Sequence, residues 1–308
     1  MPLDPQIAQF LEYVEQAGYP PVHESTPDDA RKAMRAMTVD VVTPEMVVPV
    51  GEVRELKVPG GHGEREARLY LPEGAGPWPT TVFFHGGGFV IGDLDTHDQI
   101  CRRLCRDAAT AVLSVDYRLA PEDPFPAAAD DVIAAVGWVG EHRDELGGGR
   151  RIAVAGDSAG GNLAAVAAQA RPDVVCAQLL IYPATDALTD RPSRTDNAKG
   201  YLLEVATMEW FFAHYVSDEQ QGHDPRVSPL QAESLAGQPT AVVVTAEFDP
   251  LRDEGEAYAD RLATSGVPVD RVRYDGMLHG FLDFLELSPG AAAAYQDLAA
   301  RFRRCLHG

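Results

Sequence analysis

The chain has 308 residues, of which 45% are hydrophobic, and a formal net charge of −21 at pH 7. This composition is that of a folded globular protein and excludes a disordered chain, which has too few apolar residues for a core. The length fits one large domain with an appended piece. The charge argues against nucleic acid or an anionic membrane as a partner, because both would repel the protein.

The N-terminal residues indicate where the protein is located, and the cysteines indicate whether disulfides or a metal site are expected. The start, "MPLDPQIAQF", lacks the basic region and the long apolar core of a signal peptide, and no apolar run approaches the length of a membrane span. We therefore expect a cytoplasmic protein that does not insert into membranes. No Cys-x-x-Cys or Cys/His ligand spacing appears, so we expect neither a disulfide framework nor a metal site from Cys101, Cys105, Cys176 and Cys305.

Two helices are predicted before the first strand. Apolar residues recur at helical spacing from Ile7 to Val14, which predicts an amphipathic helix over about residues 4–17. A second helix is predicted from Pro27 to Met37, with Thr26 as its N-cap. Because both helices precede the strand signals, they can cover another part of the molecule instead of joining the sheet.

From Val53 onward the pattern changes to strands. The runs "VRELKV" and "EARLYLP" predict a hairpin at a sheet edge. Later runs are too apolar for a strand with one exposed face and fit strands buried on both faces: "TTVFFH", "TAVLSVDY", "RIAVAG", "CAQLLIYP" and "TAVVVTAE". Helical stretches lie between or after them, near residues 95–108, 127–145, 158–170, 253–265 and 289–305. This alternation predicts an α/β fold with a mostly parallel sheet and helices on both faces.

One segment interrupts the alternation. Thr189 to Val216 follows a strand, is rich in polar loop residues, and then enters a helix crowded with aromatic side chains. This helix could pair with the N-terminal helices as a lid, or its aromatic residues could be ordinary core packing.

The sequence "GDSAG" at residues 156–160 places Ser158 between an apolar run and an alanine-rich helical run. It matches G-x-S-x-G, the nucleophile elbow, where a sharp turn from strand to helix holds the serine in a strained backbone conformation. Gly156 and Gly160 provide clearance, because side chains there would collide. The helix N-terminus adds free amides and a positive dipole where an oxyanion would form.

A serine nucleophile needs a base, usually a histidine held by a carboxylate, and in this fold the acid precedes the histidine, each just past a strand. The run "TAVVVTAEFDPLRDEG" offers Glu247, Asp249, Asp253 and Glu254. Asp249 is our choice because it lies a short loop beyond the strand, and Glu247 is kept as the second candidate. Asp253 and Glu254 open the next helix, where acidic side chains oppose the dipole.

His279 is the predicted base. The run "VRYDGMLHGF" ends a strand and places this histidine on a loop beside Gly280. His223 lies upstream of Asp249, which is the wrong order. The remaining candidates precede the serine, lie on predicted helices or end the chain: His23, His62, His142, His214 and His307.

The run "FFHGGGFVIG" places three glycines directly after a strand. Their amides can approach a substrate and form an oxyanion hole, whose donors must be in place before charge develops. The alternative is a flexible glycine turn without that role. His85 is expected to brace this loop by hydrogen bonds, and the amide of Ala159, directly after the nucleophile, is expected to be a further donor.

Together, "HGGGF", "DYRLAPEDPFPAAADD", "GDSAGGNLA", "DPLRDEG" and "HGF" resemble the bacterial hormone-sensitive-lipase-like carboxylesterases, the family IV esterases of the α/β-hydrolase superfamily. The resemblance runs from about Arg65 to the C-terminus, and the first fifty residues match only in character. In this family "YRLAPE" is a structural signature, so we expect Arg118 and Glu122 to make buried polar contacts.

The resemblance implies an α/β-hydrolase fold with a mostly parallel central sheet flanked by helices and a helical cap. Residues 1–50 would form the N-terminal cap helices, residues 51–308 the catalytic domain, and the region around 189–216 a cap insertion. It also implies a carboxylesterase that hydrolyses short- to medium-chain acyl esters through an acyl-enzyme intermediate, with no metal or cofactor. Homodimers are common among similar proteins, so a homodimer is possible here. The expected binding partner is a small-molecule ester substrate.

The same resemblance assigns roles to individual residues. It implies a triad of Ser158, Asp249 and His279. The oxyanion donors would come from Gly86, Gly87, Gly88 and Ala159, of which we favour the last three. Candidates for the acyl pocket are Phe89, Met208 and Phe211.

Two other functions stay open from the sequence. Some plant hormone receptors resemble these esterases and bind small molecules without catalysis, although they are expected to have a broken triad. An amidase or peptidase could use the same serine, and no residue here separates ester from amide cleavage.

Overall fold

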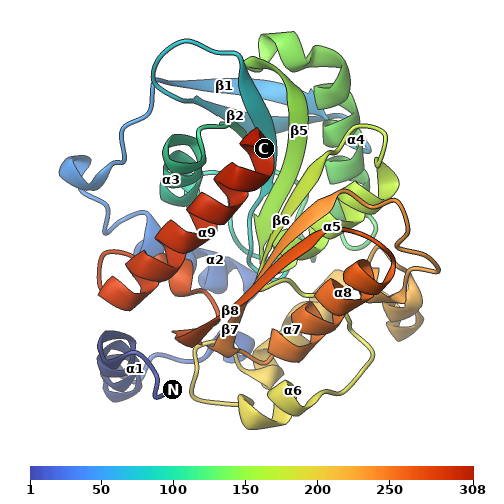
Figure 1. The fold of residues 1–308 in the computed structure, drawn as a ribbon. Helices are drawn as coiled ribbons and strands as arrows, with labels where there is room; N and C mark the ends of the chain where they lie inside the picture. Colours follow the sequence, from blue (N-terminus) through green and yellow to red (C-terminus); the bar gives the residue numbers. More distant parts are fainter.

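An eight-stranded sheet runs through the computed structural model, which describes residues 1–308 (Figure 1). The strand order is β1-β2-β4-β3-β5-β6-β7-β8, and β2 is antiparallel to both β1 and β4, while the remaining pairs are parallel. The strands are β1 (Glu52–Pro59), β2 (Glu64–Leu71), β3 (Trp78–Phe84), β4 (Ala111–Val115), β5 (Gly148–Asp157), β6 (Ala177–Ile181), β7 (Thr240–Phe248) and β8 (Val269–Leu278). The predicted edge hairpin and the mostly parallel sheet are thus confirmed.

Helices cover both faces of the sheet (Figure 1). One face is covered by α3 (Asp98–Ala108) and α9 (Pro289–His307). The other face is covered by α4 (Ala127–His142), α5 (Ala159–Ala170) and α8 (Arg252–Thr264). The side chains of β3 alternate between the two cores, since Val82 and Phe84 join one and Phe83 the other. Strands buried on both faces explain the continuous apolar runs in the sequence.

The N-terminal helices form where the sequence predicts them. Helix α1 (Pro5–Ala17) is capped by Asp4, whose side chain accepts from the amides of Gln6 and Ile7, and it ends at Gly18 in the left-handed conformation. Helix α2 (Pro27–Thr38) is capped by Thr26, as predicted, through the amide of Asp29. These caps satisfy amides that a helix leaves without partners at its start.

The segment that interrupts the alternation forms two helices, α6 (Pro192–Asp196) and α7 (Val205–Tyr215). The N-terminal region meets α7 at one polar contact, where His23 Nδ1 lies 3.0 Å from Thr207 Oγ1. Helix α1 packs elsewhere: Phe10 meets the ring of Phe284 edge-on, with centroids 5.0 Å apart. Helix α1 therefore contacts the chain near Phe284, while His23, which lies between α1 and α2, contacts α7.

The "YRLAPE" segment agrees with expectation at one residue and differs at the other. Arg118 donates to both oxygens of Asp131, which is fully buried. Glu122 is 56% exposed and pairs with Arg31 of α2. The predicted buried contact for Glu122 is wrong, because its loop lies at the surface beneath α2. None of the helices has both the length and the apolar character needed to cross a membrane.

Candidate active site

Ser158 lies at the turn from β5 to α5, with φ of 55° and ψ of −119°. Few residues with a side chain adopt such a backbone, so the turn is strained. A Cβ on Gly156 would lie 2.2 Å from the carbonyl oxygen of Gly160, and a Cβ on Gly160 would lie 1.9 Å from the carbonyl oxygen of Phe84. The clearance predicted for these two glycines is confirmed, because a side chain at either position would displace backbone.

Three side chains from different strand ends meet in one hydrogen-bonded line. His279 Nε2 lies 3.0 Å from Ser158 Oγ, and His279 Nδ1 lies 2.9 Å from Asp249 Oδ2. Asp249 follows β7, His279 follows β8, and the Asp249 side chain is fully buried and also accepts from the amide of Leu251. This arrangement allows the imidazole to take a proton from the hydroxyl while the carboxylate fixes its orientation.

The other carboxylates of the predicted acid segment have different partners. Glu247 accepts from the N-terminal ammonium group and from the amide of Gly276. Asp253 accepts from the amide of Ser193, and Glu254 pairs with a nearby arginine. Asp249 is thus the carboxylate that reaches His279.

The glycine-rich loop after β3 presents free amides beside the serine. Gly86 is not among them, since its amide donates to Asp157 Oδ1 at 2.9 Å. The amides of Gly87 and Gly88 donate to no group within the protein. Ala159 begins α5, and the first amides of a helix have no acceptor in their own helix. The amides that remain available are those of Gly87, Gly88 and Ala159.

His85 braces the glycine loop, as predicted. It is fully buried, its Nδ1 lies 2.7 Å from the carbonyl oxygen of Gly86, and Tyr117 donates to its carbonyl oxygen at 2.7 Å. Burial lowers the pKa of His85 to about 4, so the imidazole is neutral at physiological pH.

A buried histidine–carboxylate pair also lies beside the glycine loop, and the sequence did not predict it. His97 Nε2 lies 3.4 Å from Asp157 Oδ1, and both side chains are buried. Burial opposes ionisation of each group, but their mutual attraction outweighs it, so the pKa of His97 is raised and that of Asp157 lowered. Asp157 belongs to the motif "GDSAG", but no local sequence pattern identifies His97 as its partner.

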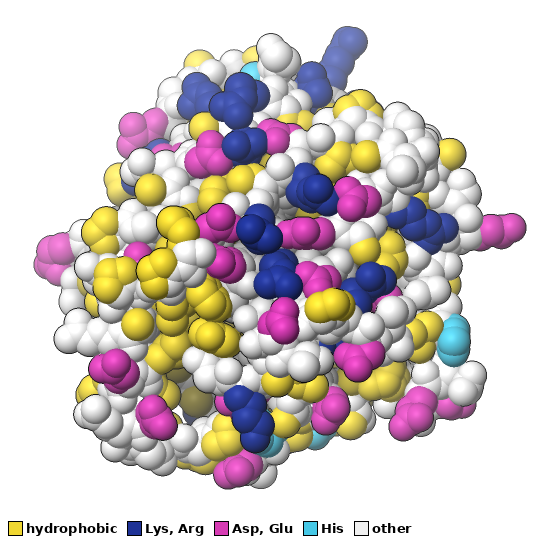
Figure 2. Space-filling view, turned by 60° about the horizontal axis from the view of Figure 1, so that its bottom comes forward, with side chains coloured by type: hydrophobic (Ala, Val, Ile, Leu, Met, Phe, Trp, Pro, Cys, Tyr) yellow, Lys and Arg dark blue, Asp and Glu magenta, His cyan; other side chains and the backbone are white.

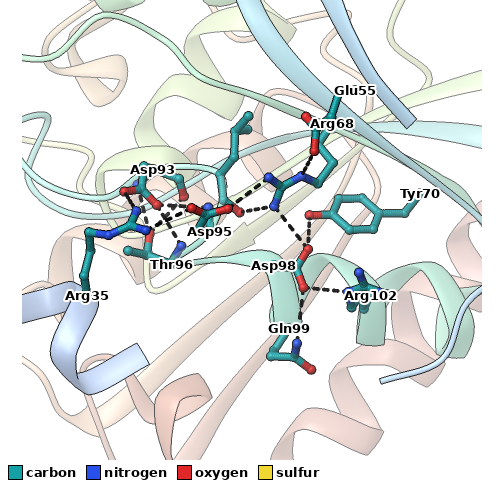
Figure 3. Close-up of polar contacts among 11 residues, drawn as sticks. Arg35, Glu55, Arg68, Tyr70, Asp93, Asp95, Thr96, Asp98, Gln99 and Arg102 are labelled. Atoms are coloured by element: carbon teal, nitrogen blue, oxygen red, sulfur yellow. Dashed lines mark hydrogen bonds and ion pairs between the residues drawn. The ribbon is translucent and has the colours of Figure 1, made fainter. Parts of the chain in front are cut away.

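Hydrogen bonds and ion pairs connect helix α2 to the segment that follows the glycine loop. Arg31 Nε donates to the carbonyl oxygen of Val90 at 2.9 Å. Arg35 pairs with Asp93 and donates to Asp95 Oδ2 at 3.0 Å (Figure 3). Asp93 in turn accepts from the amide of Asp95, which holds this segment in a tight turn.

The same network continues to the sheet edge. Arg68 on β2 binds Asp95, Glu55 and Asp98, the last at the start of α3 (Figure 3). Helix α2, the loop beside the serine and the sheet are therefore joined through shared carboxylates.

We expect Arg35→Met to lower kcat for a reaction at Ser158 about tenfold with little change in KM, because small displacements of the amide donors beside the serine weaken transition-state stabilisation. Steady-state kinetics and a thermal melt check this. Arg106→Met is the matched control, since Arg106 forms a comparable pair with Asp107 on α3 and does not line the cavity beside Ser158. An equal loss of kcat in both variants would contradict a role for Arg35 in holding the loop.

A cavity of about 320 Å³ opens beside Ser158 and His279. Phe89, Met208 and Phe211 all line it, as do residues from the N-terminal region, Val22 and Met34. Helix α7 approaches the glycine loop closely, because a Cβ on Gly88 would lie 2.1 Å from the Phe211 ring. Figure 2 turns the bottom of the molecule forward and shows hydrophobic side chains gathered around a hollow on this face.

Comparison with known proteins gives consistent matches. The model of the alpha/beta hydrolase fold family matches residues 81–283. The carboxylic ester hydrolase LipN of Mycobacterium tuberculosis is 46% identical over 286 residues, which cover 89% of this chain and 75% of LipN. The ethyl acetate hydrolase of Pseudomonas putida is 37% identical over 299 residues, covering 92% of each chain.

Solved structures agree over nearly the whole length. The hyperthermophilic esterase of Pyrobaculum calidifontis has a TM-score of 0.93 at 40% identity, covering 99% of both chains. The ester hydrolase EH1AB1, from the metagenome of Lake Arreo and in complex with a bipyridine phosphonate derivative, has a TM-score of 0.93 at 41% identity, covering 98% of both chains.

Proposed function

The chain belongs to the α/β-hydrolase fold family and is a carboxylic ester hydrolase, and we propose that it cleaves small esters by acyl transfer to Ser158. The hydrogen-bonded line from Ser158 through His279 to Asp249 carries this proposal. The strained turn and the free amides beside it support the same assignment.

The reaction proceeds in two steps. His279, oriented by Asp249, takes the hydroxyl proton as Ser158 attacks the ester carbonyl. The amides of Gly87, Gly88 and Ala159 donate to the oxyanion of the tetrahedral intermediate. His279 then protonates the leaving alcohol and later activates the water that releases the acid from the acyl-enzyme.

The cavity supports short- to medium-chain acyl esters as substrates. Its volume of about 320 Å³ lies at the small end of ligand pockets. Phe89, Met208 and Phe211 form the acyl pocket, while residues 1–50 and 189–216 act as the cap over the catalytic domain. A cytoplasmic location and a homodimeric assembly stay predictions, which cell fractionation and size-exclusion chromatography test.

Covalent labelling tests the proposed function. A p-nitrophenyl alkylphosphonate should release p-nitrophenolate and leave a phosphonyl group on Ser158, located by peptide mass spectrometry. Excess p-nitrophenyl butyrate should give a burst of p-nitrophenolate if deacylation is the slower step. Absence of both adduct and turnover would favour a non-catalytic binding protein. Faster cleavage of p-nitrobutyranilide than of the ester would favour an amidase.

A further inference from the structure

Two carboxylates line the catalytic cavity without a partner, Glu209 and Asp283. Neither side chain forms a hydrogen bond or an ion pair within the protein, and both are exposed to the space beside them. The remaining carboxylates of the lining are all paired: Asp157 with His97, Asp186 with Arg191, and Glu254 with Arg194. The only arginine of the lining, Arg194, is therefore already neutralised, and the free charge facing the cavity is negative.

Asp283 lies next to the catalytic imidazole. It follows His279 by four residues, within the short turn Phe281–Phe284, and its amide donates to the carbonyl oxygen of Gly280 at 3.0 Å. A Cβ built on Gly280 would lie 3.8 Å from Asp283 Oδ2, so the carboxylate lies over this glycine. Its neighbours Phe281 and Phe284 point into the core, whereas Asp283 faces the cavity.

The position of Asp283 indicates which part of a substrate it would meet. The leaving oxygen must lie within hydrogen-bonding distance of His279 Nε2 to receive its proton. The alcohol portion of the ester therefore lies beside residues 280–283. The Asp283 side chain is exposed to this space, so its charge can act directly on a group of the substrate that lies there.

We propose that Asp283 is a specificity-determining residue that selects esters whose alcohol portion carries a positively charged amino or ammonium group. This inference rests on the proposed function, because it requires the alcohol to leave next to His279. A cation would supply the partner that Asp283 lacks. An ester with a carboxylate in the same place would be repelled by Asp283, and the overall charge of −21 further favours the approach of cations.

The ionisation of Asp283 makes the selectivity depend on pH. The protein atoms packed around Asp283 desolvate its carboxylate and raise its pKa to about 6, although one side of it is exposed to the cavity. His97 and His279 lower this pKa, and Asp157 raises it. Tyr182 is the other titratable group packed beside Asp283 and His279. Below pH 6 the protonated carboxyl group can no longer attract a cation through its charge, so the preference should weaken as pH falls.

Two acetate esters of the same shape test the proposal. Acetylcholine carries a quaternary ammonium group where 3,3-dimethylbutyl acetate carries a neutral tert-butyl group. We expect kcat/KM to be about tenfold higher for the charged ester at pH 8, and this ratio to fall to about one in Asp283→Asn. Glu141→Gln, which removes a charge from α4 away from the cavity, is the matched control and should keep the wild-type ratio.

The wild-type protein provides a second measurement that does not depend on the variant folding. The same ratio should decline between pH 8 and pH 5, because any effect of pH that both esters share cancels in the ratio. A ratio near one in the wild type, or a ratio that Asp283→Asn does not change, would overturn the proposal. If 3,3-dimethylbutyl acetate and p-nitrophenyl butyrate are not hydrolysed at all, the proposed function itself fails, which distinguishes the two outcomes.

Discussion

Replacing Ser158 with alanine is expected to lower kcat for p-nitrophenyl butyrate about 10⁶-fold, the scale measured when a serine hydrolase loses its nucleophile. Without the hydroxyl no acyl-enzyme can form, and the remaining rate comes from the oxyanion donors and from binding. Alanine keeps a Cβ at the strained position, so the backbone at residue 158 experiences the same steric demand as in the wild type.

Three measurements make this prediction specific. Steady-state rates should collapse, the p-nitrophenolate burst should disappear, and the melting temperature should change little. A variant that folds normally and retains more than about one hundredth of the wild-type kcat would show that another residue is the nucleophile.

The second large effect is expected at Asp249. Asp249→Asn should lower kcat about 10⁴-fold, because an amide can hold His279 in the wrong tautomer while leaving the geometry nearly intact. The residue is fully buried and accepts hydrogen bonds from both His279 and the amide of Leu251. The decrease in kcat should therefore be larger than any change in KM. Steady-state kinetics measures the two quantities separately.

Glu247→Gln is the matched control for Asp249→Asn. It removes the rival carboxylate of the same strand end, whose partners are the N-terminal ammonium group and the amide of Gly276. We expect a kcat near that of the wild type and a small decrease in melting temperature. A large loss of kcat in Glu247→Gln together with a small one in Asp249→Asn would reverse the assignment of the acid.

Much of the fold follows from local sequence pattern. Runs such as Thr240–Phe248 are apolar on both faces, and only a strand inside a covered sheet accounts for that. The elbow was predictable for a steric reason, since Gly156 and Gly160 stand where any side chain would meet backbone. The order of serine, acid and histidine then limited the choice of partners to a few residues.

Other features depend on which distant surfaces meet, and no local pattern carries that information. Asp283 was overlooked because a single carboxylate after "HGF" resembles any exposed acid until the cavity wall is built around it. The pairing of Arg35 with Asp93 joins residues from two separate elements through side chains at the surface. Glu122 was misjudged for the same reason, because the position of Arg31 above it decides its environment.

The backbone of residue 158 also bears on how the enzyme moves during turnover. Its conformation costs roughly 1–3 kcal/mol, yet it is fixed by hydrogen bonds on both sides, from its amide to Ile181 and to its carbonyl oxygen from Asn162 and Ala184. The hydroxyl is thus already aimed before a substrate arrives. The motions that accompany each cycle are then those by which small molecules enter and leave the cavity, and relaxation experiments should detect them in the segments that line it.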